Sequence, residues 1–95
     1  MNQIERIQYY EAILDEAVEA VRMLDEALEN YGNVQDKIKE LEAYYDSPLW
    51  MKDYKEDEEG KIPKDLKRGV LSEDAVYNFL SEYAVIQQRL KEGLK

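Results

Sequence analysis

The first 31 residues contain neither glycine nor proline, and they carry an apolar repeat that a helix aligns on one face. Apolar residues follow one another at alternating spacings of three and four, which is the a/d pattern of a heptad repeat. We call this set the seam: Ile7, Tyr10, Leu14, Ala17, Val21, Leu24, Leu28 and Tyr31. The pattern predicts one helix over residues 3–31, about 43 Å long at 1.5 Å per residue.

Further apolar residues beside the seam widen it into a stripe. They are Ile13, Val18, Ala20 and Ala27. A stripe of this width is typical of a helix in a globular bundle, whereas a two-stranded coiled coil needs only the narrower seam. The first helix is therefore expected to bury this face against other helices.

A second helix is expected over residues 34–45. Its apolar residues again repeat at helical spacing, and they are Val34, Ile38, Leu41 and Tyr45. Gly32 suits the left-handed residue that commonly ends a helix, and Asn33 suits the cap of the next one. Such a short link predicts that the second helix folds back antiparallel on the first.

Two serines mark the expected starts of the remaining helices. Ser47 suits an N-cap and Pro48 the first helical position, which predicts a short helix over residues 48–57. Ser72 suits the cap of a last helix over residues 73–91, after an irregular connection over residues 58–71. The expected buried stripe of that last helix consists of Val76, Phe79, Tyr83, Ile86 and Leu90.

Together these elements predict an all-α fold in one domain, residues 1–95. The expected architecture is an antiparallel three-helix bundle with a long first helix, a short extra helix and an irregular connection before the last helix. The first helix is longer than either partner helix. Its excess length must pack on the short helix, on the connection or on a second copy, and this mismatch favours a homodimer.

The missing residue types exclude several kinds of chemistry. The chain has no Cys and no His, which rules out a thiol nucleophile, a thiolate metal site and a Ser–His–Asp triad. An EF-hand centred on Gly60 fails because Lys55 and Leu66 occupy positions that need carboxylates. We therefore assign no catalytic, cofactor-binding or metal residue, and we expect no cofactor.

The charge of the chain is acidic and unevenly distributed. The formal net charge is −9, and residues 1–60 hold 17 acidic against 6 basic side chains. This charge repels phosphates and anionic lipids, so neither direct nucleic-acid binding nor membrane binding is expected. The N-terminal residues lack the apolar stretch of a signal peptide, and a cytoplasmic protein is expected.

The stretch over residues 44–74 gathers residue types that often bind partners. It holds the only Trp of the chain, both prolines and a basic cluster. The candidate partner-binding residues, here called the candidate set, are Trp50, Asp53, Tyr54, Asp65, Lys67, Arg68 and Asp74. The structural alternative is that Trp50 and Tyr54 close the end of the bundle. In that case Arg68 pairs with an aspartate of the candidate set.

The same stretch carries a resemblance to a known family. The residues concerned are Tyr44-Tyr45-Asp46-Ser47, Trp50, Asp53, Tyr54, Gly60, Pro63 and the run from Asp65 to Asp74. With the leading helix, they resemble the bacterial family catalogued as domain of unknown function 4298. The resemblance implies a helical cytoplasmic protein, and it implies no activity and no site residue.

The residues favour a non-enzymatic protein–protein interaction module with an unidentified protein partner. One alternative is an acidic nucleic-acid mimic that occupies a basic protein. Another is a small-ligand or enzyme site around Trp50 and Arg68.

Overall fold

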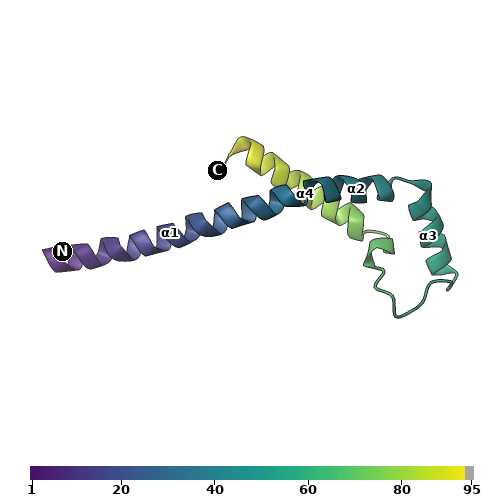
Figure 1. Ribbon diagram of the computed structural model, residues 1–95, viewed down its shortest axis with the longest axis horizontal. Helices are drawn as coiled ribbons and strands as arrows, with labels where there is room; N and C mark the ends of the chain where they lie inside the picture. The colour runs from purple at the N-terminus through teal and green to yellow at the C-terminus, as the bar shows by residue number, and fades with distance from the viewer. Residues whose placement is uncertain (94–95) are drawn as a thin grey trace. The chain divides into compact units, whose positions relative to one another are not determined.

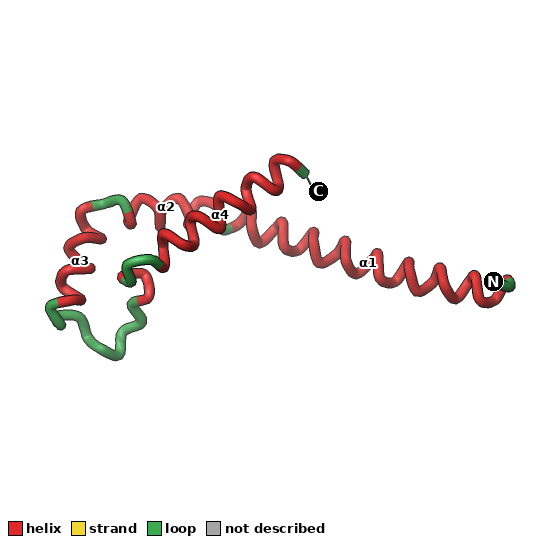
Figure 2. Tube along the Cα trace, turned by 180° about the vertical axis from the view of Figure 1, so that it is seen from behind, coloured by secondary structure: helices red, strands yellow, loops and turns green. Residues whose placement is uncertain are grey.

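The computed structural model describes residues 1–93, and every regular element in that range is helical (Figures 1 and 2). The elements are α1 (Gln3–Asn33), α2 (Gln35–Tyr45), α3 (Pro48–Glu58), the 3-10 helix η1 (Gly69–Leu71) and α4 (Ala75–Glu92). The all-α class is thereby confirmed. The antiparallel bundle and the single domain remain predictions. The chain divides into a first unit, Met1–Asp36, and a second unit that begins at Lys37.

A reciprocal cap begins α1 in the first unit. The Glu5 amide donates to Asn2 Oδ1 at 2.9 Å, and the Asn2 amide donates to Glu5 Oε1 at 3.4 Å. This capping box satisfies two backbone donors that lack a partner within the helix. This cap was not predicted from the sequence, although an Asn followed three residues later by a Glu is its signal.

The end of α1 differs from the expectation, because Gly32 does not stop the helix. Within residues 1–93 the positive-φ glycines are Gly60 and Gly93, and α1 continues through Asn33. The Val34 amide and the Gln35 side-chain amide both donate to the Tyr31 carbonyl, at 3.4 and 2.8 Å. Since these donors satisfy the end of the helix, no left-handed glycine is needed, and Asn33 lies inside α1 instead of capping α2.

The expected cap at the start of α3 is confirmed. Ser47 Oγ accepts from the Trp50 amide at 3.4 Å, and Pro48 occupies the first turn. Gly60 follows the helix with φ of 76°, a conformation that a glycine adopts without strain. The start of α4 at Ala75 is two residues later than expected. Ser72 Oγ accepts from the Ala75 amide at 3.2 Å, so this serine closes the turn before the helix.

The second unit has a small core. Its buried side chains are Ile38, Trp50, Leu71 and Val76. The packing between elements runs through η1, which contacts both α3 and α4. Of the stripe expected for the last helix, Val76 is buried and Tyr83 is half-buried, whereas Phe79 and Leu90 are 39% and 43% exposed. The prediction of a continuous buried stripe is therefore wrong.

Candidate interaction surfaces

Trp50 is a buried residue of the second unit with several contacts. Its side chain is 8% exposed and stacks on Tyr54, with ring centroids 5.2 Å apart and planes 16° from parallel. Tyr45 meets it edge-on at 5.0 Å. The indole Nε1–H donates to the Val70 carbonyl at 2.9 Å, which links α3 to η1. The aromatic ring and the polar atom of Trp50 both have partners within the chain.

Two tyrosine hydroxyls of this unit donate hydrogen bonds to carboxylates. The Tyr44 hydroxyl donates to Asp53 Oδ2 at 2.6 Å, and the Tyr54 hydroxyl donates to Glu73 Oε1 at 2.8 Å. Burial and then the bond to Asp53 raise the pKa of Tyr44 from 10.0 to about 12. The bond to Glu73 raises the pKa of Tyr54 as well. Both hydroxyls therefore remain protonated donors at neutral pH, which suits a structural bond.

Arg68 pairs with a carboxylate outside the candidate set. Its guanidinium donates to Asp57 Oδ1 at 2.5 Å, and the two side chains are 33% and 22% exposed. The expected pairing with an aspartate of the candidate set is therefore wrong. Asp57 lies in the last turn of α3, so the ion pair holds the segment that leads into η1.

The structure separates the candidate set into two groups. Trp50, Asp53, Tyr54 and Arg68 each have a partner within the second unit. The remaining members are exposed, and they are Asp65, Lys67 and Asp74. The bonds of the first group explain how the irregular segment is held on α3. Partner binding by the whole set remains a prediction.

The seam of α1 is an exposed apolar surface. No residue of this 31-residue helix is buried. Tyr10, Leu14 and Val21 are 57%, 55% and 67% exposed, and Leu24 and Leu28 are 43% and 45% exposed. A continuous exposed apolar face on a soluble chain marks an interaction site or an aggregation hazard.

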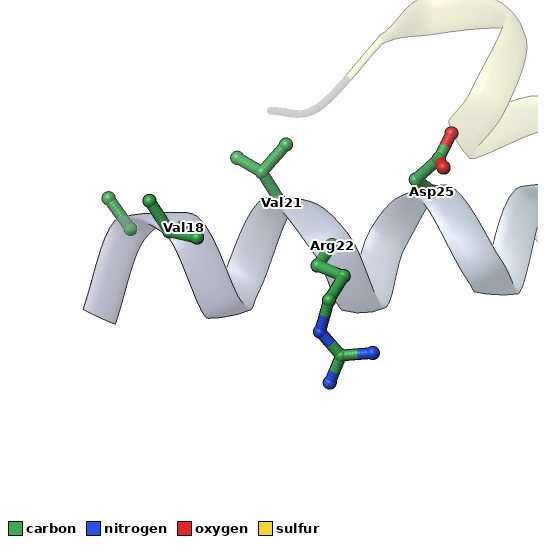
Figure 3. A pocket seen from close by; sticks show the side chains of 5 residues that line it. Val18, Val21, Arg22 and Asp25 are labelled. Carbon is green, nitrogen blue, oxygen red and sulfur yellow. The ribbon is translucent and has the colours of Figure 1, made fainter. Parts of the chain in front are cut away.

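The opposite face of α1 is charged. Arg22 bridges Glu19 and Glu26 through contacts of 2.5 and 2.6 Å, and the bond to Glu19 raises the pKa of Arg22 further. Figure 3 shows Val21 and Asp25 projecting from one side of the helix and Arg22 from the other. A hollow beside the seam is lined by Ala17, Val18, Val21, Arg22 and Asp25. Its lining offers one cation, one carboxylate and otherwise apolar atoms.

Neither surface carries a metal-binding arrangement. In residues 1–93, no three acidic side chains are grouped closely enough to hold a metal ion. No helix in the same range has the length and apolar character to cross a membrane.

The fold and these surfaces define a small all-α protein whose long first helix leaves its apolar face exposed. The chain belongs to the family described as domain of unknown function (DUF4298), which matches residues 7–92. The resemblance noted in the sequence is thereby confirmed, and the match includes most of α1 together with the second unit. No curated protein and no solved structure matches the chain.

Proposed function

We propose that the protein is a non-enzymatic protein–protein interaction module and that the seam of α1 is its interaction surface. One observation carries this proposal: a helix of 31 residues presents eight regularly spaced apolar positions and buries none of them. Amphipathic helices are recognised through such positions when they lie against an apolar partner surface.

The energetics of α1 support a partner. Helices in proteins gain most of their stability from packing of the apolar face, not from intrinsic propensity. Like-charged neighbours at i, i+4, namely Glu11 with Asp15 and Asp25 with Glu29, each cost a few tenths of a kcal/mol. Burying a half-exposed Leu such as Leu14 contributes about 1 kcal/mol. The free energy gained by covering the seam is therefore several times larger than the free energy lost to charge repulsion.

The antiparallel three-helix bundle predicted from the sequence is the intramolecular alternative, in which the chain covers its own seam. The lengths of the helices argue against a complete cover of the seam by the second unit. The seam runs from residue 7 to residue 31, about 36 Å at 1.5 Å per residue. The longest helix of the second unit, α4, has 18 residues, or about 27 Å.

An acidic mimic that binds a basic protein is the alternative function, and it uses another face. Most acidic residues of α1 lie away from the seam, and they are Glu5, Asp15, Glu16, Glu19, Glu26 and Glu29. Binding through that face is weakened by salt, whereas binding through the apolar seam is not weakened by it. Bacterial origin and cytoplasmic location remain predictions.

Site-specific photocrosslinking in cells of the source organism tests the proposal. A photoreactive side chain replaces Ala17, which lies in the seam, or Ala12, which lies on the opposite face of the same helix. Both residues are exposed alanines, so the two variants differ only in the face that they probe. We expect intermolecular adducts from position 17 and none from position 12.

Two results contradict the proposal. Equal adducts from both positions indicate nonspecific contact, and the absence of adducts from both indicates that no chain covers the seam. Circular dichroism of each purified variant serves as the control for folding. Repeating the crosslinking in a lysate at low and high salt separates the seam from the acidic face.

A further inference from the structure

We propose that the partner of the seam is the seam of a second copy of this chain, in an antiparallel pair. Leu14 then lies against the partner's Leu24. This inference rests on the proposed function and specifies its partner. Three properties of α1 lead to it: its length, the sizes of its seam residues and the distribution of its charge.

The length of α1 fits a second α1. A partner helix must offer an apolar face over the whole seam, and an identical 31-residue helix does so. Both copies present large apolar side chains that are about half exposed, among them Ile7 at 54% and Leu24 at 43%. A symmetric pair covers both faces at once, which is the arrangement that closed homodimers share.

The sizes of the seam residues select the antiparallel orientation. With Ile7 at position a, antiparallel helices pair each a residue with a d residue of the partner. The register that covers the whole seam gives four kinds of layer: Ile7 with Tyr31, Tyr10 with Leu28, Leu14 with Leu24, and Ala17 with Val21. Each tyrosine thus meets a branched aliphatic residue instead of another tyrosine, and Ala17 meets the larger Val21.

The parallel orientation pairs each seam residue with its own copy. Tyr10 then meets Tyr10, and Ala17 meets Ala17. These layers are overfilled and underfilled respectively, and protein interiors tolerate neither a void nor crowding well. The antiparallel register therefore packs more evenly.

The charge of α1 also favours the antiparallel orientation. Residues 15–29 hold six acidic side chains and one basic side chain, a net charge of −5. Residues 3–14 hold two acidic side chains and one basic one, a net charge of −1. Parallel helices place the whole of residues 15–29 beside the same residues of the partner. In the antiparallel register only residues 15–23 lie beside their own copy, and residues 24–29 lie beside the weakly charged residues 9–14 of the partner.

One flanking pair has the opposite preference, and it provides a test. In the antiparallel register Glu11 faces the partner's Asp25, which is repulsive. In the parallel register Glu11 faces the partner's Arg6, which is attractive. The substitution Glu11→Lys therefore changes the dissociation constant in opposite directions for the two orientations, and it leaves the seam intact.

Disulfide trapping determines the orientation directly, because the chain has no native cysteine. Leu14→Cys and Leu24→Cys proteins are mixed in equal amounts, oxidised mildly and analysed by intact mass. Antiparallel pairs place Cys at 14 opposite Cys at 24. Two copies of the same variant then hold their cysteines ten residues apart, about 15 Å along the axis, too far for a disulfide.

We expect the mixed disulfide in large excess over disulfides between identical variants. The matched control, Ala12→Cys on the opposite face, is expected to give none. For Glu11→Lys we expect a dissociation constant about tenfold lower than that of the wild type. Disulfides between identical variants, or an unchanged or higher dissociation constant for Glu11→Lys, overturn the antiparallel pair.

If light scattering gives a monomeric molar mass for the wild-type chain at every concentration examined, the inference that a second copy is the partner is overturned. If such a monomer still gives adducts with another protein from position 17, the proposed function stands and only this inference fails. If it gives none, both fail.

Discussion

Replacing Trp50 tests how the second unit is held together. Trp50 is 8% exposed, stacks on Tyr54 and bonds to the Val70 carbonyl. Trp→Ala substitutions at buried sites cost about 3–5 kcal/mol. A unit of this size has a free energy of unfolding of roughly 3–9 kcal/mol, from typical values per residue. Trp50→Ala is therefore expected to remove a third or more of the stability of the second unit.

Urea unfolding followed by circular dichroism measures this loss. The matched control is the neighbouring Leu49→Ala, because Leu49 is 62% exposed and its truncation is expected to cost within about 0.5 kcal/mol. Trp50→Phe is a milder variant that keeps an aromatic ring and loses the bond to Val70. It is expected to cost roughly 1–2 kcal/mol, and it keeps the measurement possible if Trp50→Ala does not fold. A loss for Trp50→Ala no greater than that for Leu49→Ala would refute the assignment of Trp50 to the core.

The remaining predictions concern single contacts. Arg68→Ala is expected to lower the free energy of unfolding by about 1 kcal/mol, because its carboxylate partner becomes unpaired, whereas Lys67→Ala changes it within about 0.5 kcal/mol; equal urea midpoints would contradict the ion pair. The pKa of Tyr44 is about 12 in the folded chain against 10.0 ordinarily, so its stabilising contribution is complete below pH 10 and is lost as pH rises towards 12. Tyr44→Phe is expected to remove this part of the alkaline decline, and an identical decline in both proteins would contradict it. Ala17→Glu is expected to raise the dissociation constant of self-association at least about tenfold by sedimentation equilibrium, and Ala12→Glu to leave it nearly unchanged; similar effects from both would argue against the seam.

The helices were predictable from the sequence because their signals are local. The a/d repeat of the seam and the cap at Ser47 with Pro48 each depend on a few neighbouring residues. Gly32 misled the prediction because a left-handed glycine is only one way to satisfy a helix end. The amides of Val34 and Gln35 provide another.

The contacts of the candidate set depend on the path of the chain, which no local pattern encodes. The spacing of Trp50 and Tyr54 by four residues indicates a ring contact on one helix face. The bond from Trp50 to the Val70 carbonyl joins residues twenty positions apart. Likewise, several aspartates lie within reach of Arg68 in sequence, and only the placement of η1 against α3 selects Asp57.

The central claim is that the seam of α1 is covered by another copy of the chain. Amide hydrogen exchange measured at increasing protein concentration tests it most directly, with the core of the second unit as internal reference. We predict that α1 amides exchange rapidly in dilute protein and become protected as the concentration rises, while protection around Trp50 and Leu71 stays constant. Protection of α1 that does not change with concentration would contradict the claim, and strong protection already in dilute protein would show that the chain covers its own seam.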